Sequence, residues 1–529
     1  MLDVILNFKP TGMKTMKIIK KITKSIVILI VLTSASACKD YLNIQPVDRL
    51  TGNNFYQNKD DVEANIANMY SRFFEKINES WVIGAIGEAR TGEIFVSPNA
   101  NGYNSRKAIE ALGRNELITA MTVQDYVDRY HFENITNWTT YYQVIQTANI
   151  LIDKLNEGIP ALGDSDTRRY LAEATFIRCF TYFWMVRLYG DVVYYTEPYE
   201  SDPLPREDMV SVLNKCIADL ESQKDNSPWT LSDVAQRGAR ASRGSIIALL
   251  MHMNMWNAGF DQSHSEGYYR KVAALGQELV NSGAYRLLPM DDDNWALVTK
   301  GRSEESLFEF YRSINYDDDV SNLAPFGDHF LRWPYKFPRY DAQISICYYT
   351  ADYMEKIFPS SEADKRKDIW FEEMLANDGQ FVARKFGLNV YASGNENKNP
   401  DNTFLIFRYA DAILLWSEAL ANLGEDGSAT DALNIIRKRA GASDVTGLTG
   451  TALKDAIFME RCRELFGEGH RYFDLVRTRR ILNSSWVAHP LNQDQFTRRA
   501  WTWPINNSAL TNNPYMVLNQ YWLPGGGGN

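Results

Sequence analysis

The chain has 529 residues and a formal net charge of −10 at pH 7, and 13% of its residues are aromatic. This length suits two or three domains or one large helical body, and the acidic balance argues against nucleic acid as a partner. The sequence contains no zinc-type cysteine spacing and none of the motifs HExxH, GxxxxGK[ST] and GxSxG, so the commonest catalytic signatures are missing.

The N-terminal segment has the composition of an export signal. Lysines between positions 14 and 24 precede the apolar run SIVILIVL, which is too short to span a bilayer stably. Small residues then precede Cys38, an arrangement that resembles a bacterial lipobox, in which the cysteine becomes an acylated N-terminus. We therefore predict a lipoprotein signal peptide at 1–37, with Met13 or Met16 as alternative starts and lipidation at Cys38. The alternative is an ordinary signal peptide cut at an Ala-x-Ala site, with Cys38 uninvolved.

Helical periodicity begins soon after this segment. The first helix is predicted to start near Lys59 with Asn58 as its cap, and its partner helix ends near residue 155. The stretch 170–195, YLAEATFIRCFTYFWMVRLYGDVVYY, predicts a long helix that ends at Gly190. Because apolar residues cover most of its circumference, this helix is expected to lie in the core, covered on several sides.

Paired helices recur along the rest of the chain. We predict a mainly α fold: a degenerate tetratricopeptide-like stack of about four helix pairs with a loop-rich binding subdomain. The pairs are expected at 59–155, 168–224, 241–283 and 405–478, the loop-rich insertion at 288–403, and all of them within a single body that spans 38–529. The last helix is predicted to run over 453–477.

Two long excursions, 81–130 and 288–403, interrupt the helical pattern, and such excursions often carry function. An aromatic ring can stack on the apolar face of a sugar ring, while amide, arginine and acidic groups bind its hydroxyls. For each aromatic or polar residue in these excursions, packing within the loop is the alternative. The candidate ligand-binding residues are Trp81, Arg90, Asn101, Tyr103, Trp295, Trp333 and Tyr335.

Two groups of charged residues invite other interpretations. The aspartate runs at 291–293 and 317–319 are candidate calcium ligands, but neither has the glycine and glutamate offsets of an EF-hand, so no cofactor is expected, with calcium as the alternative. The segment 460–477, ERCRELFGEGHRYFDLVR, permits a catalytic interpretation, yet ion pairs along a helix explain it better. The expected pairs are Glu460 with Arg463, Arg461 with Glu464, and Arg471 with Asp474.

Four cysteines remain besides Cys38, and their positions show no disulfide framework. We predict that they are buried free thiols. Cys179 and Cys216 lie on consecutive predicted helices, so a bond between these two stays open.

Six groups of residues together resemble the SusD/RagB family of surface nutrient-binding lipoproteins, and they extend over nearly the whole mature chain. Each is weak alone, and their order carries the resemblance. Arg243 departs from the lysine common in the family, and the Gly-rich C-terminus from its usual ending. The groups are Cys38 with Asp40-Tyr41-Leu42; Trp138 with Tyr142 and Asn149; Glu173 with Arg178 and Arg187 to Asp191; Arg243-Gly244; Arg408 to Asp411 with Glu418; and Glu460-Arg461 with Glu464, Glu468-Gly469, Arg471, Asp474 and Arg477.

The resemblance implies four degenerate tetratricopeptide units and no catalytic activity. It also implies a lipid-anchored protein on the cell surface of the outer membrane, which captures oligosaccharides for a SusC-like TonB-dependent transporter. In the family, the two excursions contribute the binding loops. Two alternatives stay open: capture of oligopeptides by the same architecture, and a glycoside hydrolase that uses two carboxylates.

Overall fold

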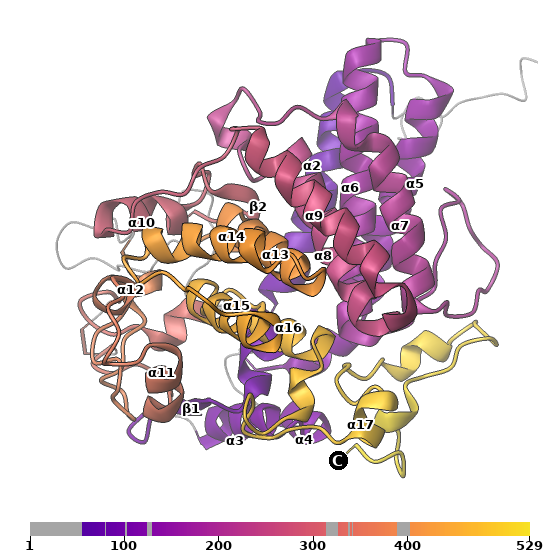
Figure 1. Ribbon diagram of the computed structural model, residues 1–529. Helices are drawn as coiled ribbons and strands as arrows, with labels where there is room; N and C mark the ends of the chain where they lie inside the picture. The colour runs from indigo at the N-terminus through magenta and orange to yellow at the C-terminus, as the bar shows by residue number, and fades with distance from the viewer. Residues whose placement is uncertain are drawn as a thin grey trace, which may run out of the picture. The chain divides into compact units, whose positions relative to one another are not determined.

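The computed structural model describes residues 56–79, 81–100, 103–123, 130–313, 326–336, 339–340, 342–388 and 402–528, with the backbone alone at 103–105 (Figure 1). The chain divides into two compact units, Met1–Asp61 and Val62–Asn529. In the first unit, the Asn58 Oδ1 accepts hydrogen bonds from the amides of Asp60 (2.8 Å) and Asp61 (3.2 Å), which confirms the predicted helix cap. The predicted signal peptide and Cys38 lie outside the described residues.

Helices dominate the described part of the chain, as predicted. The longer ones are α2 (Lys59–Asn78), α3 (Tyr103–Gly113), α5 (Thr139–Glu157), α6 (Asp164–Tyr189), α7 (Met209–Gln223), α8 (Arg243–Phe260), α9 (Ser265–Asn281), α13 (Tyr409–Asn422), α14 (Asp426–Arg439) and α15 (Gly450–Glu464). The shorter ones are α4 (Leu117–Met121), α10 (Asp292–Lys300), α11 (Ala351–Ile357), α12 (Arg366–Trp370), α16 (Arg471–Arg477) and α17 (Gln493–Thr497). None of the helices in the described ranges is long and apolar enough to cross a membrane.

Neighbouring helices pack in pairs within the second unit, which confirms the tetratricopeptide-like prediction. α6 packs against α5 and α7, α8 against α9, and α13 against α9, α14 and α15 (Figure 1). A single helix pair cannot bury its own apolar faces. Successive pairs therefore stack on one another and bury these faces in one continuous core.

α6 is the central core helix that the sequence predicts. Every side chain from Ala172 to Tyr189 is buried, and Gly190 ends the helix with a left-handed φ of 75°. The Phe180 ring centroid lies 5.1 Å from that of Phe73 on α2 and 5.0 Å from that of Phe308. The expected burial on several sides is therefore confirmed.

Two short antiparallel ribbons accompany the described helices. β2 (Ser306–Phe310) pairs with β4 (Phe404–Arg408) and both strands are buried along their length, while β1 (Ile94–Val96) pairs with β3 (Cys347–Tyr349). The two predicted excursions therefore contain short strands and helices as well as loops. Elements this short show too little of a period to be recognised in the sequence.

The prediction of one last helix over 453–477 is wrong, because this stretch forms α15 and α16 with a turn between them. Gly467 and Gly469 adopt φ values of 74° and 83°, which favour glycine. A Cβ on Gly467 would lie 2.7 Å from the Phe386 ring, so the turn also depends on a close approach that only glycine permits.

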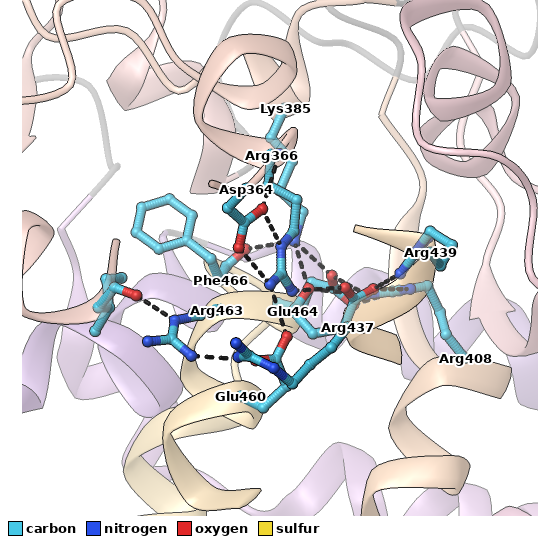
Figure 2. Close-up of polar contacts among 12 residues, drawn as sticks. Asp364, Arg366, Lys385, Arg408, Arg437, Arg439, Glu460, Arg463, Glu464 and Phe466 are labelled. Carbon is cyan, nitrogen blue, oxygen red and sulfur yellow. Dashed lines mark hydrogen bonds and ion pairs between the residues drawn. The ribbon is translucent and has the colours of Figure 1, made fainter. Parts of the chain in front are cut away.

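A buried ion-pair network surrounds the end of α15 (Figure 2). The Glu464 carboxylate lies 3.1 Å from the guanidinium of Arg366 and 3.1 Å from that of Arg408, and it also contacts Arg439. Burial raises the pKa of Glu464, but the neighbouring arginines outweigh burial and lower it to about 2. The network joins α15 to α12, β4 and α14.

One of the three predicted ion pairs of this segment is confirmed: Glu460 lies 3.1 Å from Arg463. The other two are wrong, because both arginines point to partners that are distant in sequence. Proximity along a helix decides which side chains can meet on its surface, whereas buried side chains pair with whichever element packs on them. The observed partners are Asp411 (2.8 Å) and Asp474 (2.9 Å) for Arg461, and Glu93 (2.9 Å) for Arg471.

The cysteines in the described part of the chain are buried and free, as predicted; they are Cys179, Cys216, Cys347 and Cys462. Cys179 and Cys216, whose pairing the sequence left open, form no disulfide. The Cys179 Sγ instead lies 3.7 Å from the carbonyl oxygen of Cys216. Burial raises the pKa of the Cys216 thiol well above its usual value, which keeps the thiol protonated and unreactive.

Candidate functional site

The two excursions meet in space. β1 comes from the first and β3 from the second, and Ile94 lies opposite Tyr349 in their ribbon. The contact continues beyond the strands, since Ser97 donates its backbone N–H to the Ile346 oxygen (2.8 Å) and its hydroxyl to the Ser345 oxygen (2.7 Å). The residues predicted to bind ligand therefore belong to two segments that are joined by strand pairing and hydrogen bonds.

Trp81, from the first excursion, is buried against residues of the second excursion. Its side chain is 2% exposed, and its ring stacks on Phe326 at 5.3 Å and on His329 at 4.6 Å between centroids. The predicted ligand contact is wrong for Trp81, because a ring enclosed by the second excursion has no surface left for a ligand.

Arg90 and Trp295 are also core residues, contrary to the prediction. The Arg90 Nη1 donates to the Trp501 oxygen (2.7 Å), its guanidinium lies 4.2 Å from the Tyr472 ring, and burial lowers its pKa to about 10. Trp295 is fully buried, with its ring 4.6 Å from that of Trp370. Both side chains pack against aromatic rings within the core.

Trp333 presents an open ring, as the sequence analysis expects of a binding residue. Its side chain is 38% exposed, and the Arg339 guanidinium lies 4.7 Å from the ring centroid. The Trp333 amide donates to the Ala342 oxygen at 2.7 Å, which fastens the loop that carries the ring. An exposed indole on a fastened loop can stack on a flat apolar face at little entropic cost.

Tyr335 follows on the same loop and is half-buried. Its hydroxyl donates to Glu372, and burial raises its pKa to about 12. Of the other two predicted residues, Asn101 lies outside the described residues and Tyr103 is described by its backbone alone, at the start of α3. Their predicted roles stay predictions.

Three more aromatic side chains of the two excursions are exposed or half-buried, and the sequence analysis did not select them as ligand-binding residues. Tyr340 is 75% exposed on the same loop as Trp333. Phe95 of β1 and Tyr348 of β3 are half-buried and stack at 6.2 Å between centroids. In each strand the middle residue is half-buried between two buried ones, and this alternation could have pointed to Phe95 and Tyr348. A strand of three residues is too short to establish such an alternation in the sequence.

A small apolar cavity is lined by residues of both excursions. Its walls include Ile83, Phe326, Phe386 and Ile406, and its volume is about 30 Å³. That volume holds a water molecule or two but not a sugar ring, so the cavity is part of the packing between the two excursions.

Two buried carboxyl groups bear on the hydrolase alternative. Burial raises the pKa of Glu88 and that of Glu309 to about 7, a value suited to a general acid. However, Glu88 is 2% and Glu309 1% exposed, and Glu88 is bound by the Gly469 amide (2.9 Å) and the Tyr349 hydroxyl (3.2 Å). Glycosidases place two carboxyls against the substrate, and these two carboxyls lie below the surface.

Metal binding finds limited support in the described residues. The Asp291 carboxylate accepts the Asn294 amide at 2.9 Å as the cap of α10, and the aspartates 317–319 lie outside the described residues. One carboxylate and two histidines, Asp411, His252 and His470, place their ligand atoms within 4.8 Å of one another. Asp411 already binds His252 (2.6 Å) and Arg461 (2.8 Å), so its oxygens are occupied by protein donors. Calcium binding stays an untested alternative.

Comparison with known proteins identifies the architecture. A model of the SusD family matches residues 372–522, and a model described as "starch-binding associating with outer membrane" matches residues 48–251. SusD-like protein P38 of Formosa agariphila is 24% identical over 95% of this chain and 99% of its own. A laminarin-binding SusD-like protein is 22% identical, with a TM-score of 0.65 over 88% of this chain and 99% of its own.

The crystal structure of a SusD homologue from Bacteroides thetaiotaomicron is more similar. It is 36% identical, with a TM-score of 0.80 over 89% of this chain and 100% of that one. Identity at this level over nearly the whole body, together with the shared helical stack, leads to one conclusion: the chain belongs to the SusD family.

Proposed function

We propose that this protein is a non-catalytic receptor that captures oligosaccharides at the surface of the outer membrane. The exposed ring of Trp333, on a loop of the second excursion that the hydrogen bond from Trp333 to Ala342 fastens, carries this proposal. Trp333 and Tyr340 offer apolar faces for sugar rings, and Arg339 offers donors for hydroxyls. The starch-binding description of one matching family model and the laminarin-binding neighbour support a glycan as the ligand.

Replacing Trp333 by alanine is expected to weaken glycan binding about tenfold, or by about 1.4 kcal/mol, because the stacking surface is lost. Calorimetric titration with laminarin and starch oligosaccharides, after a panel has shown which one binds, measures this change. The melting temperature should change less than for a core tryptophan, since the side chain is 38% exposed and one face of its ring contacts Arg339.

Tyr515→Ala is the matched control, because this tyrosine is 59% exposed on the C-terminal segment. Equal affinity in the Trp333 variant, the control and the unaltered protein would contradict a ligand site at Trp333. Trp81→Ala, by contrast, is expected to lower the melting temperature.

Binding of peptides in the same panel, without glycans, would favour the oligopeptide alternative. Cleavage of the bound glycan would favour the hydrolase.

The lipid anchor is the second part of the proposal. Replacing Cys38 by alanine is expected to move the protein from the membrane fraction to the soluble fraction, because acyl chains on this residue would be the anchor. Membrane fractionation with immunoblotting measures this shift, and Cys179→Ala, a change at a buried free thiol, serves as the control. A Cys38 variant that stays in the membrane fraction would show that the attachment does not depend on this residue and would contradict the lipid anchor at Cys38.

Delivery to a SusC-like TonB-dependent transporter is the third part, and it rests on the resemblance to the family. A pull-down of the tagged protein from solubilised outer membranes tests it. We expect a TonB-dependent transporter among the captured proteins, and its absence would contradict this part alone.

A further inference from the structure

A recess lies in the helical body, on elements other than those that carry Trp333. It has an inner part with a volume of about 210 Å³ and an outer, more open part of about 480 Å³. Both parts are lined by residues from the end of α8, the start of α9 and the end of α13. The residues common to both are Ala258, Gln262, Tyr269 and Asn422.

Cations surround the inner part of this recess: Lys454, Arg477, Arg479 and Arg480. Two of them are neutralised within the protein. Glu418 lies 2.6 Å from the Arg477 guanidinium, and Asp455 lies 2.5 Å from that of Arg480. The one carboxylate of the outer part, Glu266, is paired with Arg270 at 2.6 Å.

The other two cations lack a counter-ion among the described residues. Lys454 is half-buried in α15 and has no carboxylate in contact. The Arg479 Nη2 reaches the Gly259 carbonyl oxygen at 3.5 Å, and the Arg479 Nε is buried without a hydrogen-bond partner in the described part of the chain. A buried donor without an acceptor is costly, and two uncompensated cations that line one recess favour an anion there.

We propose that this recess is a second ligand site, which binds a small sugar that bears a carboxylate or sulfate group. The anionic group lies between Lys454 and Arg479, where charge-assisted hydrogen bonds hold it. The hydroxyls face Gln262 and Tyr269 in the outer part. The two parts together have the size of an ordinary small-molecule site, about 300–1,000 Å³. The sugar component rests on the proposed function, whereas the anion component rests on the charges alone.

Calorimetric titrations at constant ionic strength test the site with three probes: glucuronate, inorganic sulfate and glucose. We expect glucuronate and sulfate to bind and glucose to bind at least tenfold more weakly, because it lacks the anionic group. Lys454→Gln and Arg479→Gln should each weaken glucuronate binding at least tenfold. Lys438→Gln, at an exposed lysine near the end of α14, is the control and should leave the affinity unchanged.

Several results would overturn the proposal: no binding of glucuronate, equal binding of glucose, or full affinity in the double variant of Lys454 and Arg479. Circular dichroism of each variant shows whether it is folded, and Lys454→Gln alters a half-buried side chain only. Sulfate binding without glucuronate binding would reduce the recess to an adventitious anion site and overturn the sugar ligand.

The two sites can be separated by experiment. Trp333→Ala should leave glucuronate binding at the recess unchanged, and Lys454→Gln should leave neutral glycan binding unchanged. Glucuronate binding that depends on Lys454 in a protein that binds no neutral glycan would contradict the proposed function and support the recess. Loss of glucuronate binding in the Trp333 variant would overturn the recess as a separate site.

Discussion

Replacing Glu464 by glutamine is expected to lower the free energy of unfolding by about 3–5 kcal/mol, the cost of breaking a buried ion pair on one side. The side chain is fully buried, and it faces the guanidinium groups of Arg366, Arg408 and Arg439. Glutamine keeps the shape of the side chain but removes its negative charge, so each of the three buried arginines loses one carboxylate partner. Urea unfolding followed by circular dichroism measures the loss.

Glu116→Gln is the matched control, because this glutamate forms an exposed pair with Arg114 at 3.0 Å. Exposed pairs contribute about 0–1 kcal/mol, so this variant should unfold almost as the unaltered protein does. If the Glu464 variant lost no more stability than this control, the network would not stabilise the fold.

The pH dependence of stability follows from the same carboxylate. The pKa of Glu464 in the folded protein, about 2, lies below the ordinary value of a glutamate, so the unfolded chain binds its proton more readily. The stabilisation is therefore present above the ordinary pKa and is lost as the pH falls toward 2. The Glu464 variant should lack this contribution and show a smaller loss of stability over that acid range.

The second large effect is expected in α6, where Phe180→Ala should destabilise the fold by about 3–5 kcal/mol. The side chain is fully buried, and its ring packs on Phe73, Phe308 and Phe407. Four elements meet at this ring, so the surroundings have little freedom to collapse into the cavity that alanine leaves. Trp184→Ala should cost a similar amount, because its ring is also buried.

Thermal unfolding measures both changes, with Val517→Ala as the control at a side chain that is 61% exposed. The control should shift the melting temperature by no more than a typical surface substitution. A Phe180 variant that melts with the control would show that α6 is peripheral, contrary to its burial.

Much of the fold follows from local patterns in the sequence. The 3.6-residue period and Gly190 predict α6 and its end, and Asn58 predicts the start of α2. The periodicity continues past Glu464, yet the chain turns at Gly467 and Gly469 because the turn packs against Phe386, which lies far away in the sequence. Similarly, Arg471 binds Glu93 rather than a neighbour on its own helix.

The candidate sites depend on tertiary structure to a greater extent. By itself, the sequence determined the helical stack, the family resemblance and the two excursions, because periodicity is a local property of the chain and the order of motifs is visible without the fold. Tertiary structure alone decided that Trp81 is buried while Trp333 is open, since the same residue type in a similar loop is covered or exposed by segments distant in sequence. It also brought Lys454 and Arg479 to one recess, because α15 and the segment after α16 meet there only when the stack is folded.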